Sequence, residues 1–122
     1  MAANDLAHIP GQQQLLFFKE KEQKLEDSFW RFHADNPQVY SELVKLAREW
    51  RSRRGLATCG IKMLYEVCRW NLTLRTEGEP LKLNNNYHAF YARLMMALEP
   101  DLEGLFSLRE QRLEFNPAKG DR

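Results

Sequence analysis

The chain has 122 residues, the size of one ordinary domain and enough to close a hydrophobic core without disulfides. Hydrophobic residues make up 43% and charged residues 29%, a balance that favours folding over disorder. Because 18 Lys and Arg face 17 Asp and Glu, the net charge of +1 excludes a protein that binds through bulk charge. No apolar run approaches the ~20 residues that span a bilayer and no signal-peptide pattern opens the chain. We therefore expect a cytoplasmic protein with no membrane partner.

The N-terminal third predicts an arm followed by two helices. Residues 1–14 contain a Pro-Gly pair and three Gln without a hydrophobic period, which indicates a flexible arm. Over residues 19–35 apolar side chains recur every three or four positions, as on one face of an amphipathic helix. Asn36-Pro37 ends this helix and begins a second, about 37–51, because proline disfavours helical geometry in the residue before it but suits a first turn.

The remaining elements give the fold class. A third helix is expected at about 59–71, and the alternation in 72–75 and 80–83 predicts a short β-hairpin. An Asn run, 84–86, caps a fourth helix at about 85–98, and a last helical segment is expected at about 101–108 before a loose tail, 111–122. We predict a mainly α, winged-helix-like single domain over 15–110, with four to five helices and one hairpin. Its core should contain Phe29, Leu43, Leu46, Ile61, Leu64, Tyr87, Phe90 and Leu94.

The residues that carry catalysis and metal binding in other proteins are sparse here. Cys59, Cys68 and the three His lack the close spacing of structural zinc ligands, and a Cys68 thiolate would need His33 or His88 brought beside it by the fold. The glycines form no phosphate-binding loop, and the paired carboxylates lie in polar stretches. We therefore expect a protein without enzymatic activity, metal or cofactor.

The charge is unevenly distributed along the chain. Residues 36–75 hold 8 basic and 3 acidic side chains, a net of +5, whereas 1–35 and 76–122 are each −2. Arginine donates to phosphate through a planar fork, so this basic third is a candidate contact surface for DNA. The candidate nucleic-acid-binding residues are Arg51, Arg53, Arg54, Lys62, Arg69 and Arg75.

A winged helix would use these residues in two ways. The helix before the hairpin enters the major groove in that fold, so Lys62 and Arg69 would face bases while the other arginines hold phosphates. Glu66 on the same face, and Glu77 and Glu79 at the wing tip, oppose this reading because phosphates repel them. Equal weight goes to a purely structural role, in which the arginines stabilise helix ends and pair with neighbouring acids.

Several short motifs resemble one family. FWRFH at 29–33, NPQVY at 36–40, GIKML at 60–64 and LNNNY at 83–87 are similar to segments of small uncharacterised proteins of bacteria and their phages, over roughly 29–109. The resemblance implies a small intracellular domain of phage or prophage origin and transfers no site. By analogy it favours two functions, DNA binding and binding of a host protein.

The alternative to DNA binding is a protein-interaction module. Leu15-Leu16-Phe17-Phe18 is the longest apolar run, and it could dock on a partner protein or on a second copy of the chain. Exposure of this run in the structure favours a protein partner. Burial of the run together with an open face shared by the arginines favours DNA.

Overall fold

The computed structural model describes residues 10–108 and 115–120. Within them the chain forms four α-helices, α2 (Pro10–Asp35), α3 (Pro37–Arg54), α4 (Ile61–Arg75) and α5 (His88–Leu98). Three short 3₁₀ turns, η1 (Asn85–Tyr87), η2 (Pro100–Leu102) and η3 (Pro117–Gly120), complete these elements, and no strand occurs in the described ranges. The mainly helical class is confirmed for this part of the chain.

The first helix is longer than the hydrophobic period predicts. α2 begins at Pro10 rather than Lys19, so residues 10–14, expected to belong to a flexible arm, are helical. Proline suits a first helical turn, and Gln and Leu are good helix formers, so local propensity continues the helix where the amphipathic pattern stops. Residues 1–9 of the predicted arm, and 111–114 and 121–122 of the predicted tail, lie outside the described residues.

The predicted hairpin, and with it the winged-helix fold, is wrong. Residues 72–75 form the last turn of α4, and 76–84 contain neither strand nor helix. Leu72, at 7% exposed, continues the buried face of α4 four residues after Cys68. Four alternating residues fit a helix as well as a strand, and packing of Leu72 into the core decides for the helix.

In the C-terminal part of the chain, the predicted buried residues are confirmed, but the predicted helix bounds are not. The Asn84 side chain accepts a hydrogen bond from the Asn86 backbone N–H (2.8 Å), so the Asn run caps η1, whereas α5 follows η1 directly and begins at His88 without a side-chain cap. The helix expected over 101–108 is wrong: η2 is a single turn, followed by Gly104 with φ +73°. Leu102, Leu105 and Phe106 are still buried in the core, and the Cys59 N–H donates to the Leu105 carbonyl (2.9 Å) beside them.

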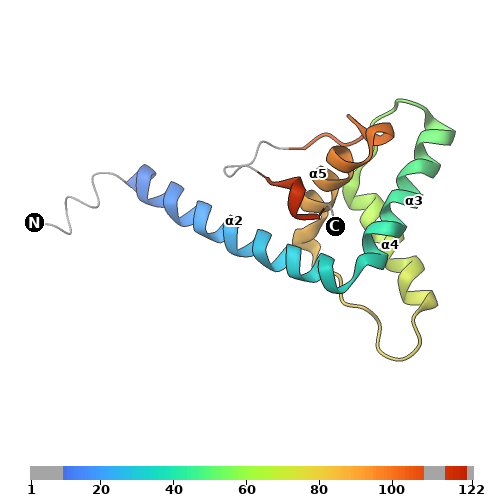
Figure 1. The fold of residues 1–122 in the computed structure, drawn as a ribbon, viewed down its shortest axis with the longest axis horizontal. Coiled ribbons are helices and arrows are strands. Elements are labelled where there is room, and N and C mark those ends of the chain that lie inside the picture. The colour runs from blue at the N-terminus through green and yellow to red at the C-terminus, as the bar shows by residue number, and fades with distance from the viewer. Residues whose placement is uncertain (1–9, 109–114, 121–122) are drawn as a thin grey trace, which may run out of the picture.

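The core lies where the C-terminal half of α2 meets α3, α4 and α5 (Figure 1). Phe29 is 0% exposed, and its ring contacts those of Tyr91 and Phe90 with centroids 4.8 and 5.3 Å apart. All eight predicted core residues are at most 9% exposed. The prediction that the helical stripes share one core is confirmed.

Candidate protein-binding surfaces

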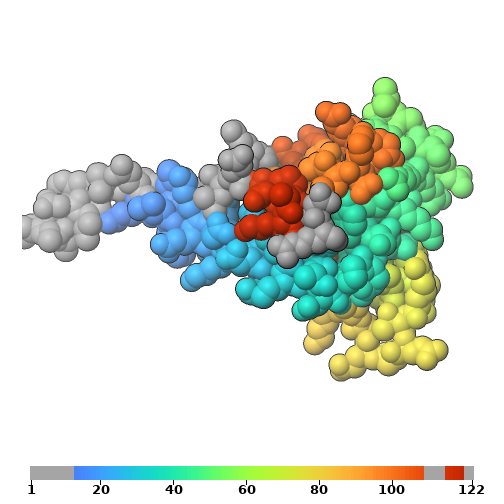
Figure 2. Space-filling view, in the orientation of Figure 1, coloured from blue at the N-terminus to red at the C-terminus, as the bar shows by residue number. Residues whose placement is uncertain are grey.

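The α2 tip, defined as residues 13–18, carries apolar side chains beyond the edge of the core. Leu15, Leu16 and Phe17 are 41%, 62% and 56% exposed. The C-terminal half of α2 lies against the other helices, whereas its N-terminal half extends away from them (Figures 1 and 2). Residues 10–18 include no charged residue, so no side chain of this segment attracts phosphate by charge. The exposed run thus favours a protein partner.

α4 has apolar residues on two opposite faces. One face is buried in the core and consists of Ile61, Leu64, Tyr65, Cys68 and Leu72. The other, which we name the outer stripe, consists of Met63, Val67, Trp70 and Leu74, spaced four, three and four residues apart. These side chains are 50%, 40%, 66% and 68% exposed. A helix at a protein surface normally carries polar residues opposite its buried face, so the outer stripe is a candidate binding surface.

A groove between α3 and α4 adjoins the outer stripe. It has a volume of about 320 Å³ and an apolar floor, and its rim is charged. Trp50 on its wall is held by a hydrogen bond from its indole Nε1 to the Ala57 carbonyl (2.8 Å). The Arg54 guanidinium lies over the Trp50 ring, 5.7 Å from its centroid. The groove residues are Leu46, Glu49, Trp50, Arg53, Arg54, Met63, Leu64 and Val67.

The outer stripe does not follow from the elements predicted from the sequence. The third helix was expected to end near residue 71, and residues 72–75, with Leu74 among them, were expected to form a strand. With α4 extended to Arg75, the four positions fall on one helical face. The signal that could have revealed them is this second period, offset by about half a turn from the buried one.

Two of the predicted DNA-contact arginines are engaged within the protein. Arg51 donates to the backbone carbonyls of Asp101 (3.2 Å), Gly55 (3.3 Å) and Glu103 (2.7 Å), which ties the end of α3 to the segment after η2. Arg75 does not lie in a strand but on the last turn of α4, where it donates to the buried Glu42 carboxylate (2.7 Å).

The other predicted contacts are more accessible but do not share one site. Arg53 lies at the end of α3, 3.4 Å from Glu49, and its side chain is 75% exposed; Arg54 is beside it. Lys62 is exposed on the first turn of α4. Arg69 pairs with Glu66 (3.3 Å) and donates to the Asn85 side chain. The structure thus gathers Arg51, Arg53 and Arg54 at one end of α4 and leaves Arg75 at the other.

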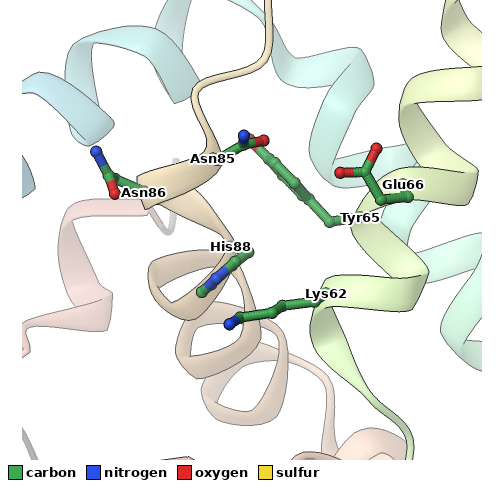
Figure 3. A pocket seen from close by; sticks show the side chains of 6 residues that line it. All are labelled: Lys62, Tyr65, Glu66, Asn85, Asn86 and His88. Carbon is green, nitrogen blue, oxygen red and sulfur yellow. The ribbon is translucent and has the colours of Figure 1, made fainter.

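A polar pocket of about 350 Å³ separates α4 from the start of α5 (Figure 3). The Tyr65 hydroxyl donates to the Asn84 carbonyl (2.9 Å), and burial raises its pKa. Burial, with help from the nearby Lys62 and Arg93 charges, lowers the pKa of His88, so this imidazole is neutral at pH 7. The pocket residues are Lys62, Tyr65, Glu66, Asn85, Asn86 and His88. The pocket therefore offers hydrogen-bonding groups, the Lys62 ammonium and the Glu66 carboxylate, but no activated nucleophile.

The two cysteines are buried free thiols. Burial raises the pKa of Cys59, and it raises the pKa of Cys68 to about 12, with the Glu42 charge adding to the effect. The Cys68 sulfur contacts the Val39 carbonyl (3.9 Å) rather than either histidine considered as its base. Among the described residues no group of three or more His, Cys, Asp or Glu is placed to hold a metal ion.

Comparisons with known proteins identify no relative. No model of a known protein family matches the chain, and no curated protein and no solved structure matches it either. The resemblance to small bacterial and phage proteins thus stays a prediction. None of the helices in the described ranges is long and apolar enough to cross a membrane.

Proposed function

We propose that the protein is a non-enzymatic protein-binding module whose α2 tip docks into an apolar groove on a partner. The observation that carries this proposal is the exposure of Leu15, Leu16 and Phe17 on a helix that extends beyond the core. An exposed apolar segment of this kind costs solubility unless a partner covers it. In helix-in-groove recognition, apolar side chains on one face of a helix anchor it in a hydrophobic groove, and Leu15 and Phe18, three residues apart and 41% and 39% exposed, share one face of α2.

DNA binding has less support from the same structure. The winged-helix arrangement that would position the cations is absent from the described residues. Arg51 and Arg75 already donate hydrogen bonds to acceptors within the protein. Arg69 pairs with Glu66 and donates to the Asn85 side chain. A phosphate backbone would have to compete with these contacts, which reduces the benefit of each arginine.

The experiment compares three forms of the full chain as bait for proteins from the native host. Leu16→Glu with Phe17→Glu removes the apolar anchors, and Gln13→Glu with Gln14→Glu adds the same charge to the same tip without removing them. We expect a protein that wild type and the Gln variant recover equally and that the Leu16/Phe17 variant recovers at least about tenfold less. The purified partner is then titrated against all three forms.

Equal recovery by all three forms contradicts the proposal. A mobility-shift titration on duplex DNA at low salt tests the competing function, because phosphate contacts are strongest there. Duplex binding that Arg53→Ala with Arg54→Ala abolishes, and that the Leu16/Phe17 variant retains, would favour DNA in place of a protein partner.

A further inference from the structure

The outer stripe of α4 is a second exposed apolar surface, on a different element from the α2 tip. Its four side chains lie on a helix whose opposite face is fully engaged in the core, so no rotation of α4 can bury both. Leu56, in the turn between α3 and α4, is a further exposed apolar side chain, at 89%. The adjoining groove has an apolar floor and room for a large side chain, about 320 Å³. These features describe an interface rather than a solvated face.

The charges around this face have opposite signs at its two ends. Arg53 and Arg54 rim the groove near the start of α4, where α3 ends, and outnumber the one acid of the groove, Glu49, which lies 3.4 Å from Arg53. The segment 76–84 after α4 holds two exposed acids, Glu77 and Glu79, and one exposed cation, Lys82. Arg75, on the last turn of α4, donates to the buried Glu42 carboxylate. The α3–α4 turn and the segment 76–84 lie at opposite ends of α4 (Figure 1). A surface with one basic and one acidic end is complementary to its own copy turned end for end.

We propose that two copies of the chain associate through α4, antiparallel about a two-fold axis between the levels of Val67 and Cys68. With a rise of about 1.5 Å per residue, Trp70 of each copy then lies level with Tyr65 of the other, over the middle of the groove that Met63 and Val67 line. Trp70 is 66% exposed and is the type of residue that most often anchors an interface. The same arrangement brings Arg53 and Arg54 of each copy toward Glu77 and Glu79 of the other.

A second copy fits this face better than DNA or an unrelated acidic helix. DNA would leave the outer stripe uncovered, because phosphates and sugars make no use of four apolar side chains in a row. A uniformly acidic helix would match Arg53 and Arg54 but would oppose Glu77 and Glu79 at the other end. Self-association through α4 is independent of the proposed function, which uses the α2 tip.

The first test measures the mass of the full chain by sedimentation velocity from about 1 to 300 μM. We expect wild type and the Leu16→Glu variant to form dimers. The Trp70→Glu variant should dimerise with an affinity at least about tenfold lower, because its new charge is left unpaired at the centre of the interface. Trp70 is mostly exposed, so its replacement leaves the core intact; an unchanged thermal melt at low concentration verifies this. Val67→Glu on the same stripe provides a second variant.

The second test uses charge reversal to check the antiparallel arrangement. Arg53→Glu with Arg54→Glu places like charges opposite each other in a homodimer, and so does Glu77→Arg with Glu79→Arg, so each variant alone should dimerise at least about tenfold more weakly. A one-to-one mixture of the two restores both pairings, and we expect heterodimers of nearly wild-type affinity. A monomeric wild type, a Trp70→Glu variant that dimerises normally, or a mixture that stays monomeric would each overturn the proposal.

Discussion

Replacing Arg75 with Met should destabilise the protein by about 1–3 kcal/mol. Arg75 lies on α4 and Glu42 on α3, and the Glu42 carboxylate is 3% exposed. This carboxylate accepts hydrogen bonds from the Arg75 guanidinium (2.7 Å) and from the Asn71 amide (2.9 Å). Loss of a hydrogen bond to a buried charge costs about 1.5–3 kcal/mol. Because the Arg75 side chain is 55% exposed, water replaces part of the lost interaction, and the expected cost falls to about 1–3 kcal/mol.

The same cluster predicts how the destabilisation depends on pH. Burial by itself would raise the pKa of Glu42, but the hydrogen bonds from Asn71 and Arg75 outweigh burial and hold the pKa below its ordinary value. The unfolded chain titrates near a pKa of about 4.3, so the cluster stabilises the folded state above that pH. Its contribution is lost as the pH falls through the lower, folded pKa. Wild type and Arg75→Met should differ most near pH 7 and least near pH 3.

Urea unfolding at pH 7, 5 and 3 measures both effects. Lys82→Met, which removes an exposed cation outside any helix, is the matched control and should change the free energy of unfolding by no more than about 0.5 kcal/mol. In a Glu42→Gln background the effect of Arg75→Met should shrink, because the buried charge is gone. An Arg75→Met variant as stable as wild type at pH 7, or equally destabilised at pH 3 and 7, would refute this account.

Two further predictions concern the core. Leu64 is 5% exposed, so Leu64→Ala should cost about 2–5 kcal/mol in urea unfolding, against about 0.5 kcal/mol or less for the exposed Arg53→Ala; an unchanged midpoint for Leu64→Ala would contradict the packing of α4. The buried Tyr91 hydroxyl has no hydrogen-bond partner among the described residues, and burial raises its pKa. Tyr91→Phe should therefore leave thermal stability unchanged or raise it by up to about 1 kcal/mol, and a comparable loss would show that this hydroxyl is bonded in solution.

The buried faces of the helices could be predicted from the sequence because burial has a simple period. Phe29, Leu43, Leu64 and Phe90 each lie on a stripe that recurs every three or four residues, and such a stripe must be covered for a helix to be stable in water. The ends of the helices follow weaker signals. Because local helix propensity is high over residues 10–18, α2 begins at Pro10. Because Leu72 packs into the core, α4 continues to Arg75.

The candidate sites were harder to predict because charges and apolar faces acquire their roles from distant residues. Arg75 meets Glu42 only after α3 and α4 pack, 33 positions apart, and Arg48 meets Glu99 and Asp101 across more than fifty. The distribution of charge along the chain therefore located the basic residues, but it could not show which acidic side chains pair with them. The misassigned hairpin also separated Leu74 from Met63, Val67 and Trp70, so the outer stripe could not be recognised.

The two proposed contacts lie on different elements, which gives their combination a physical consequence. A dimer joined through α4 leaves both α2 tips exposed, because residues 13–18 belong to a helix that extends away from the body. Such a dimer would present two identical docking helices, and a partner with two grooves would bind the second one at an effective concentration set by the first. Avidity of this kind can exceed a single contact by about 10²–10⁴-fold without any new residue. A chain that carries Trp70→Glu should then lose much of its apparent affinity for a divalent partner while each α2 tip keeps its intrinsic affinity. A monovalent partner would bind that variant and wild type equally.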